Sequence, residues 1–292
     1  MSVVALLTRH IAEVKDAFLQ GLHEGLFEDL AFIGNASSVY AWTPAWMVDI
    51  DILLFVTAFG PELGRWLETA ADRLTLRLRQ DEVDFELRII EGPYKPSIAI
   101  LKRPIVVAHL GVFTEEMYLA SPPLKRWSWR KYRCERVPDR FAARAPRQPD
   151  IAEVLNGEKG VAQRLAAVTR GRINMREWRL PDFAEVLIPI THKDPNFAEC
   201  CFAYSANCAR NHCRGLGLVQ ADQLGNEAFF PWYAAHVFPS KALLRLMEKK
   251  LECRTRGFDV DLLAVQGLSM EYMGDLKTHL EKVLAGDGSR PS

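Results

Sequence analysis

The sequence predicts an α/β fold, in which an N-terminal mixed sheet with flanking helices is followed by a mostly helical C-terminal domain. Apolar runs typical of buried strands occupy 48–56 and 104–110, and apolar residues recur at helical spacing over 61–80. From residue 151 onward the spacing is mostly helical. The domain limits that we expect are 1–122 for the α/β domain, 123–150 for a basic and aromatic segment with a linker, 151–286 for the helical domain, and 287–292 for a tail.

The first element is expected to be a packed helix within residues 1–27. Its apolar residues recur at helical spacing with charged residues between them; they are Val4, Leu7, Ile11, Val14, Phe18 and Leu22. The segment lacks a basic start and a small-residue cleavage site, so it does not resemble a signal peptide. No apolar run in the sequence reaches the length of a membrane span. We therefore expect a cytoplasmic protein without a membrane partner.

Asp49 and Asp51 interrupt the apolar strand predicted at 48–56. Residues two apart in a strand point to the same face, so the two carboxylates project side by side. Carboxylates that close repel each other unless a cation lies between them. A divalent metal is the simplest reason for the pair, and oxygen ligands suit Mg²⁺ or Mn²⁺.

A further acidic pair lies on the next predicted strand, at 82–90, where polar and apolar residues alternate. Asp84, Glu86 and Arg88 share one face of that strand. The helix predicted at 61–80 joins it to the preceding strand, and a strand–helix–strand unit brings the second strand back beside the first. We therefore expect a third carboxylate at the metal site, from one of the two acids.

These residues together resemble the polymerase-beta-like nucleotidyltransferase superfamily. The resemblance rests on the Gly turn in Phe32–Ser38, on the Asp-x-Asp strand, and on the acid-apolar-basic-apolar-apolar run Glu86–Ile90. It covers roughly residues 28–113. It implies a nucleotidyltransferase-like fold and a metal-dependent enzyme, which moves an NMP from an NTP to an acceptor hydroxyl.

The resemblance also implies a phosphate-binding turn. Its residues would be Gly34, Asn35, Ser37 and Ser38, facing the triphosphate of the NTP. The family has Gly-Ser where this chain has Gly-Asn. The hydroxyl group at the phosphate must therefore come from Ser37 or Ser38, or be replaced by the amide of Asn35.

The metal ligands follow from the same resemblance. Asp49 and Asp51 would bind Mg²⁺ (or Mn²⁺), and Glu86 would be the third metal ligand, which completes the site and helps to activate the acceptor hydroxyl. Asp84 is the alternative third acid. All four are therefore candidate catalytic residues.

The acceptor is open. The chain has 37 basic and 37 acidic side chains, so its net charge gives no reason to expect nucleic acid. A small molecule such as an antibiotic or biosynthetic intermediate is expected first, and an RNA end or a protein side chain second. The Gly-Asn departure also leaves open a non-catalytic module that binds nucleotides.

Two more apolar runs, 95–101 and 104–110, are expected to form strands, with a hairpin as one arrangement. His109 lies in the second run and is expected to be a satisfied core histidine. The segment 124–133 interleaves basic and aromatic residues. Amphipathic packing is favoured for it, with RNA binding or contact to a triphosphate or acceptor as alternatives.

In the C-terminal part, the run 196–214 looks helical and is rich in cysteine. Cys208 and His212 are four residues apart on this helix and could bind a metal, but core packing of reduced cysteines is favoured. A second helix is expected to begin after Ser240 and to stop at Gly257.

Overall fold

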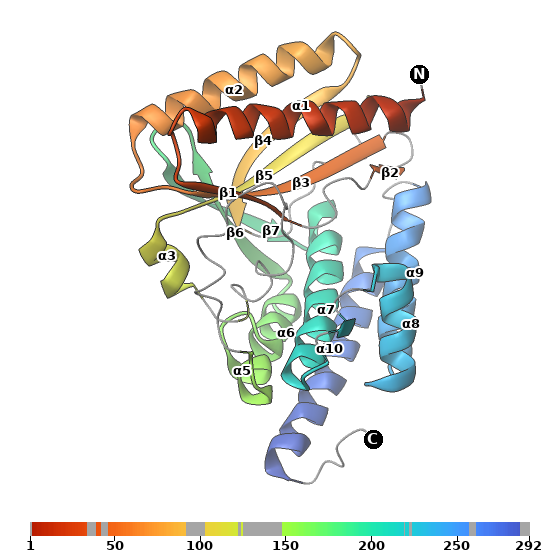
Figure 1. Cartoon of the computed structure of the whole chain (residues 1–292). Coiled ribbons are helices and arrows are strands. Elements are labelled where there is room, and N and C mark those ends of the chain that lie inside the picture. Colours follow the sequence, from red (N-terminus) through yellow and green to blue (C-terminus); the bar gives the residue numbers. More distant parts are fainter. Residues whose placement is uncertain are drawn as a thin grey trace.

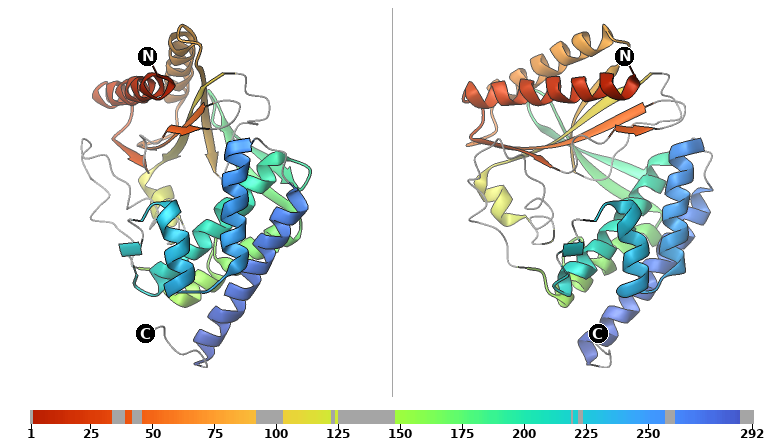
Figure 2. Two further views of the ribbon diagram at one scale, coloured as in Figure 1. Left: turned by 90° about the vertical axis from the view of Figure 1, so that its right-hand side faces the viewer. Right: turned by 45° about the vertical axis from the view of Figure 1, so that its right-hand side comes forward.

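The computed structural model describes residues 2–33, 39–41, 46–91, 103–121, 124, 148–218, 220–221, 224–256 and 261–286 (Figure 1). A mixed sheet lies at the centre of the α/β part. Two long helices cover one side of this sheet, and the C-terminal helices gather on its other side (Figure 2). The protein is therefore an α/β protein with a mixed sheet, as the sequence predicts.

The described strands join one sheet in the order β1-β3-β5-β4-β6-β7, with β2 paired to β3 outside this path. Strands β3, β5 and β4 run parallel to one another, and the other pairings are antiparallel. The strands are β1 (Asp29–Ile33), β2 (Val39–Ala41), β3 (Trp46–Phe55), β4 (Asp84–Glu91), β5 (Ile105–Phe113), β6 (Arg172–Arg179) and β7 (Ala184–Thr191).

The helices divide between the two parts of the chain. The N-terminal ones are α1 (Val3–His23), α2 (Pro61–Arg79) and α3 (Glu115–Ala120). The C-terminal ones are α5 (Ile151–Asn156), α6 (Val161–Thr169), α7 (Pro195–Gly215), α8 (Asn226–His236), α9 (Lys241–Arg256) and α10 (Leu262–Ala285). None of the described helices combines the length and apolar character that crossing a membrane requires.

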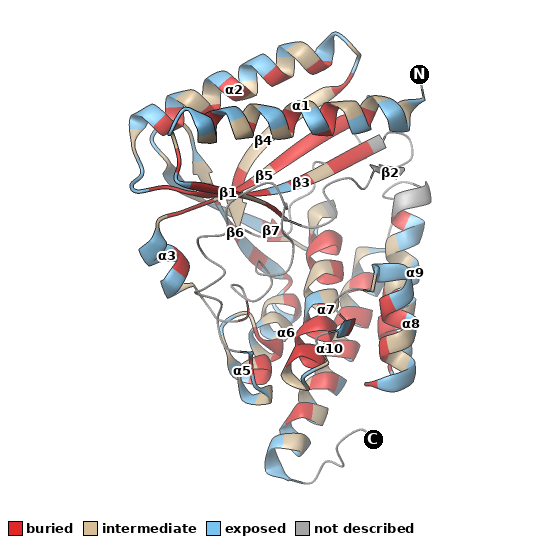
Figure 3. Cartoon of the chain, viewed as in Figure 1, coloured by how far each residue is buried: buried red, intermediate tan, exposed pale blue. Residues whose placement is uncertain are grey.

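Helices α1 and α2 cover one face of the sheet because each carries an apolar stripe (Figure 3). The Ser2 hydroxyl accepts a hydrogen bond from the Ala5 N–H at the start of α1, and Pro61 occupies the first turn of α2. The stripes pack on alternate residues of β3, among them Ile50 and Ile52. Each fully buried aliphatic side chain contributes roughly 1.5–3 kcal/mol. The face of the sheet that α1 and α2 cover is therefore part of the hydrophobic core.

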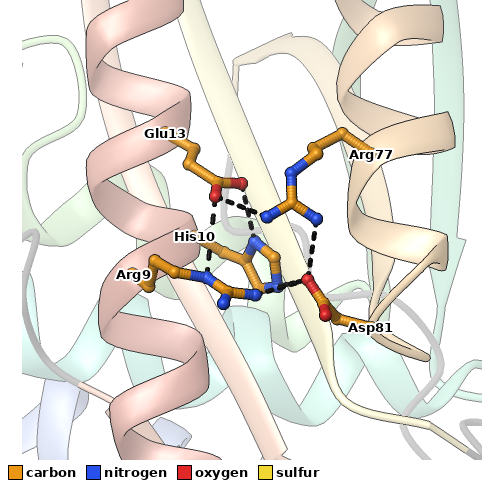
Figure 4. A network of polar contacts seen from close by, with 5 residues as sticks. All are labelled: Arg9, His10, Glu13, Arg77 and Asp81. Carbon is orange, nitrogen blue, oxygen red and sulfur yellow. Dashed lines mark hydrogen bonds and ion pairs between the residues drawn. The ribbon is translucent and has the colours of Figure 1, made fainter.

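A polar network joins α1 to the end of α2 (Figure 4). The buried His10 ring lies between two carboxylates, with Nδ1 2.9 Å from Glu13 Oε2 and Nε2 3.3 Å from Asp81 Oδ2. Arg77 bridges the same carboxylates, 2.8 Å from Asp81 and 2.9 Å from Glu13, and Arg9 also pairs with Asp81. Burial alone would raise the pKa of Asp81, but the hydrogen bonds and charges of Arg77 and Arg9 lower it. The network therefore joins the two helices at their polar edge.

Strand β5 lies between β3 and β4, so the prediction that β4 returns directly beside β3 is wrong. The reason is hydrophobicity. Ile105–Ala108 are fully buried, whereas most of β4 is only half-buried, and the most apolar parallel strand takes the central position. The run 95–101 lies outside the described residues, so a hairpin with it is not tested.

The β6–β7 hairpin extends the sheet into a region for which the sequence analysis names only helices. Strand β6 alternates exposed with buried positions, and pairs with β4 through Ile90 and Glu91. At the hairpin turn, Pro181 lies against Gly64 of α2, where an added Cβ would be 1.9 Å from the Pro181 carbonyl oxygen. Residues on either side of 150 therefore share one sheet.

The C-terminal helices form a second core. Helix α10 packs against α6, α7 and α9, and its Tyr272 is fully buried beside Tyr233 of α8. The predicted start of α9 is confirmed, because the Leu243 N–H donates to the Ser240 hydroxyl at 3.1 Å. Gly257 lies outside the described residues.

Candidate metal site

Strand register brings three polar side chains together on the face of the sheet opposite α1 and α2. Asp49 and Asp51 alternate along β3 with core residues such as Ile50, so both point away from the helices. On β5, His109 pairs with Asp51, and paired residues on parallel strands point to the same face. All three side chains therefore meet on two neighbouring strands.

The three side chains are close enough to share one ion. His109 Nδ1 lies 2.8 Å from Asp49 Oδ1 and 3.5 Å from Asp51 Oδ1. One ligand atom from each residue lies within 4.8 Å of the other two. Two carboxylates and an imidazole are ordinary ligands of divalent metals in proteins. The group could therefore hold a metal ion.

Burial differs among the three residues. The side chains of Asp49 and His109 are 16% and 11% exposed, whereas that of Asp51 is 53% exposed. The strands thus hold Asp49 and His109 in a sheltered place and leave Asp51 beside solvent. Asp51 is therefore the most accessible member of the group.

His109 is mostly buried and its Nδ1 has a polar partner, as expected of a satisfied core histidine, but that partner belongs to the acid pair. Its neighbours in β5 are apolar, so it is the one polar side chain of that strand. An isolated polar residue in a buried strand is the same signal that marks Asp49 and Asp51. To place His109 beside the two acids, one must know the order of the strands in the sheet. The residues near His109 in the sequence do not give that order.

The predicted third acid lies farther away. Glu86 on β4 is in the same row as Asp49, but Val107 of β5 separates them. Arg88 Nε donates to Glu86 Oε1 at 2.6 Å, and its Nη1 donates to Glu177 at 2.6 Å. In this arrangement Glu86 is paired with a cation of the protein, and it is not a member of the three-residue group.

Asp84 also lies on β4, one row farther along the same face. It pairs with Ile105, which in turn pairs with Met47 of β3. Strand β5 therefore separates Asp84 from the strand that carries the acid pair, and Asp84 too lies outside the group.

The predicted phosphate turn, Gly34, Asn35, Ser37 and Ser38, lies outside the described residues. The strands on either side of it are described. Ile33, the last residue of β1, pairs with Asp51, and Val39, the first residue of β2, pairs with Val48. The chain therefore enters and leaves this segment beside the acid pair.

The cysteines of α7 pack in the C-terminal core, as the sequence analysis favours. Cys208 and Cys213 are buried, and burial raises the pKa of Cys213 to about 12. His212 Nδ1 lies 2.9 Å from the Tyr233 hydroxyl, and burial first, then the charge of His279, lowers the pKa of His212 to about 3. Over the described ranges, the group on β3 and β5 is the one cluster of potential metal ligands.

Of the basic and aromatic segment 124–133 only Leu124 is described, and it is buried.

A surface groove between α1 and α2 is lined by residues such as Trp66 and Arg73, on the opposite face of the sheet from the acids. It is the hollow between two surface helices, so we place the candidate site at the acids and not there.

Comparisons with known proteins gave no match, whether with protein-family models, with curated proteins or with solved structures.

Proposed function

We propose that this protein is a metal-dependent nucleotidyltransferase with a nucleotidyltransferase-like sheet, which moves an NMP from an NTP to an acceptor hydroxyl. The observation that carries the proposal is the convergence of Asp49, Asp51 and His109 on one face of two central strands. A second observation supports it. The glycine-containing segment proposed to bind phosphate begins after Ile33, the partner of Asp51.

In this proposal Asp49 and Asp51 hold the divalent cation, and His109 completes the protein ligands. A bound divalent cation would neutralise charge on the transferring phosphoryl group and orient in-line attack. The exposed Asp51 marks the side from which the NTP enters. The turn residues Gly34, Asn35, Ser37 and Ser38 remain the proposed contacts for its phosphates.

Glu86 is assigned to the acceptor side of the site. It faces the same way as Asp49 but is held by Arg88, so it would bind a metal only after releasing that cation. As a neighbour of the acceptor, Glu86 would orient the attacking hydroxyl. Asp84 lies one row away and is the alternative for this role.

A small molecule is the proposed acceptor. The equal numbers of basic and acidic side chains give no general attraction for a polyanion such as RNA.

The test is transfer of label from α-³²P NTPs in the presence of Mg²⁺ or Mn²⁺. The protein is incubated with a cell extract separated into small-molecule, RNA and protein fractions, and each of the four nucleotides is supplied in turn. The variants are Asp51→Asn and, as a matched control, Asp72→Asn, which removes an exposed carboxylate from α2. We expect label in the small-molecule fraction with the wild type and the control, and its loss with Asp51→Asn.

Two results would contradict the proposal. Full transfer by Asp51→Asn would exclude the metal-binding role of that carboxylate. Metal-dependent nucleotide binding without transfer to any fraction would instead indicate a non-catalytic module. Label in the RNA or protein fraction would keep the chemistry and change the acceptor.

A further inference from the structure

The group on β3 and β5 contains a nitrogen ligand, and this changes which cation it should prefer. We infer that the site takes a first-row transition-metal dication, such as Mn²⁺ or Co²⁺, in preference to Mg²⁺, with His109 Nδ1 as a direct ligand. The inference deepens the proposed function by naming its cofactor. The role of the ion in nucleotidyl transfer rests on the proposed function, whereas the binding of the ion does not.

The position of His109 is fixed by the sheet. Strands β3 and β5 pair continuously from Met47 with Ile105 to Phe55 with Phe113, so neither strand can slip without moving its whole apolar face. The ring is 11% exposed and its Nδ1 faces both carboxylates. The nitrogen is therefore placed at the acid pair before any ion arrives.

The chemistry of the ligands then decides the preference. Mg²⁺ demands near-octahedral oxygen coordination and keeps several waters. Mn²⁺ also accepts oxygen ligands, but affinity for a site with a nitrogen ligand rises along the first transition row from Mn²⁺ to Co²⁺, and imidazole suits the later metals of that row best. A site with one sheltered carboxylate, one imidazole and one exposed carboxylate offers a mixed nitrogen and oxygen set. Exchanging the expected Glu86 for His109 thus moves the site away from an all-oxygen cage.

A simpler interpretation of the same geometry is an ion pair between protonated His109 and Asp49, with no metal. The two interpretations differ in what Nδ1 does. In the ion pair it carries a proton, whereas a metal-binding imidazole uses the lone pair of that nitrogen. Detection of a metal–nitrogen bond therefore separates them.

The experiment uses the full chain without nucleotide, so it does not depend on transfer activity. Binding of Mg²⁺, Mn²⁺ and Co²⁺ is measured by titration calorimetry, and the Mn²⁺ complex is examined by pulsed electron paramagnetic resonance for ¹⁴N coupling. The main variant is His109→Asn, whose amide oxygen is the same number of bonds from Cα as Nδ1. His109→Asp gives three carboxylates, and His192→Asp repeats that exchange at an exposed histidine after β7.

We expect the wild type and His192→Asp to bind Mn²⁺ and Co²⁺ more tightly than Mg²⁺ and to show ¹⁴N coupling. In His109→Asn the coupling should disappear, and the preference over Mg²⁺ should fall by about tenfold or more, since losing even an outer partner of a ligand costs that much affinity. His109→Asp should shift the preference furthest towards Mg²⁺.

Three results would overturn the inference: a wild-type Mn²⁺ complex without ¹⁴N coupling, no Mn²⁺ binding at millimolar concentration, or Mg²⁺ binding as tight as that of Mn²⁺ and Co²⁺. The first of these does not need any variant, so the inference stays testable even if the His109 variants fail to fold. Mn²⁺ binding through nitrogen without nucleotidyl transfer would support the metal site and contradict only the proposed function.

Discussion

Asp51 on β3 and His109 on β5 occupy paired positions on adjacent parallel strands, with Oδ1 and Nδ1 3.5 Å apart. On the next strand the same row continues with Arg88 of β4. An acid, an imidazole and a guanidinium thus stand side by side across the middle of the sheet. Substitutions at the acidic end of this row and at its cationic end should have different effects.

At the acidic end, the variant Asp51→Asn should unfold as readily as the wild type without metal, but added metal should no longer raise its free energy of unfolding. Asp51 is 53% exposed and lies beside another carboxylate, so its neutralisation relieves repulsion in the metal-free protein. With Mn²⁺ at 100 times its dissociation constant, the wild type should gain about 2.7 kcal/mol. Thermal unfolding with and without Mn²⁺ measures this gain. Asp72→Asn should keep it, and an equal gain in Asp51→Asn would contradict the site.

At the cationic end, Arg88→Met should lower the free energy of unfolding by about 1–3 kcal/mol, because it leaves polar partners unsatisfied. Glu177 is the critical partner, since its side chain is 8% exposed. The second substitution Glu177→Gln should recover part of the loss by removing the buried charge. Urea unfolding checks both. Arg65→Met, at an exposed position of α2, should change stability by less than about 0.5 kcal/mol.

His212 should make the C-terminal core sensitive to acid. Its folded pKa of about 3 lies below the usual 6.5, because burial disfavours the imidazolium. The neutral ring therefore stabilises the fold fully above pH 6.5, and stability is lost as pH falls towards 3, by about 1.4 kcal/mol for each pH unit. Urea unfolding between pH 5.5 and pH 4 should show this slope. His212→Gln should flatten it, whereas His192→Gln should leave it unchanged.

The described cysteines should resist alkylation in the folded protein. The five described cysteines are all buried; they are Cys200, Cys201, Cys208, Cys213 and Cys253. Burial raises the pKa of Cys201 to about 12, so the reactive thiolate is scarce at pH 8. Iodoacetamide followed by mass spectrometry should find these thiols unmodified until urea is added. Cys134 lies outside the described residues, so the measurement is made in Cys134→Ser.

Several elements follow directly from local sequence patterns. Helix α2 has an apolar stripe that must face a core, and the Asp-x-Asp strand has its alternation fixed by the apolar residues around it. The start of α9 follows from the side chain of Ser240. Each of these depends only on residues a few positions apart.

The remaining features depend on contacts between distant segments. The position of β5 between β3 and β4 decides that His109, rather than Glu86, meets the acid pair. Strand β6 alternates exposed and buried residues, but this short pattern lies in a part of the chain whose other segments have helical spacing. Its pairing with β4 is a long-range choice that neither segment encodes alone.

The contact between Gly64 and Pro181 joins the first turn of α2 to the β6–β7 hairpin. A fragment that stops at residue 150 would expose the edge of β4 that β6 now covers, and open strand edges recruit other chains. It would also uncover the first turn of α2. The sheet is therefore complete only after residue 191 has been synthesised, and nascent chains shorter than this would need protection from aggregation.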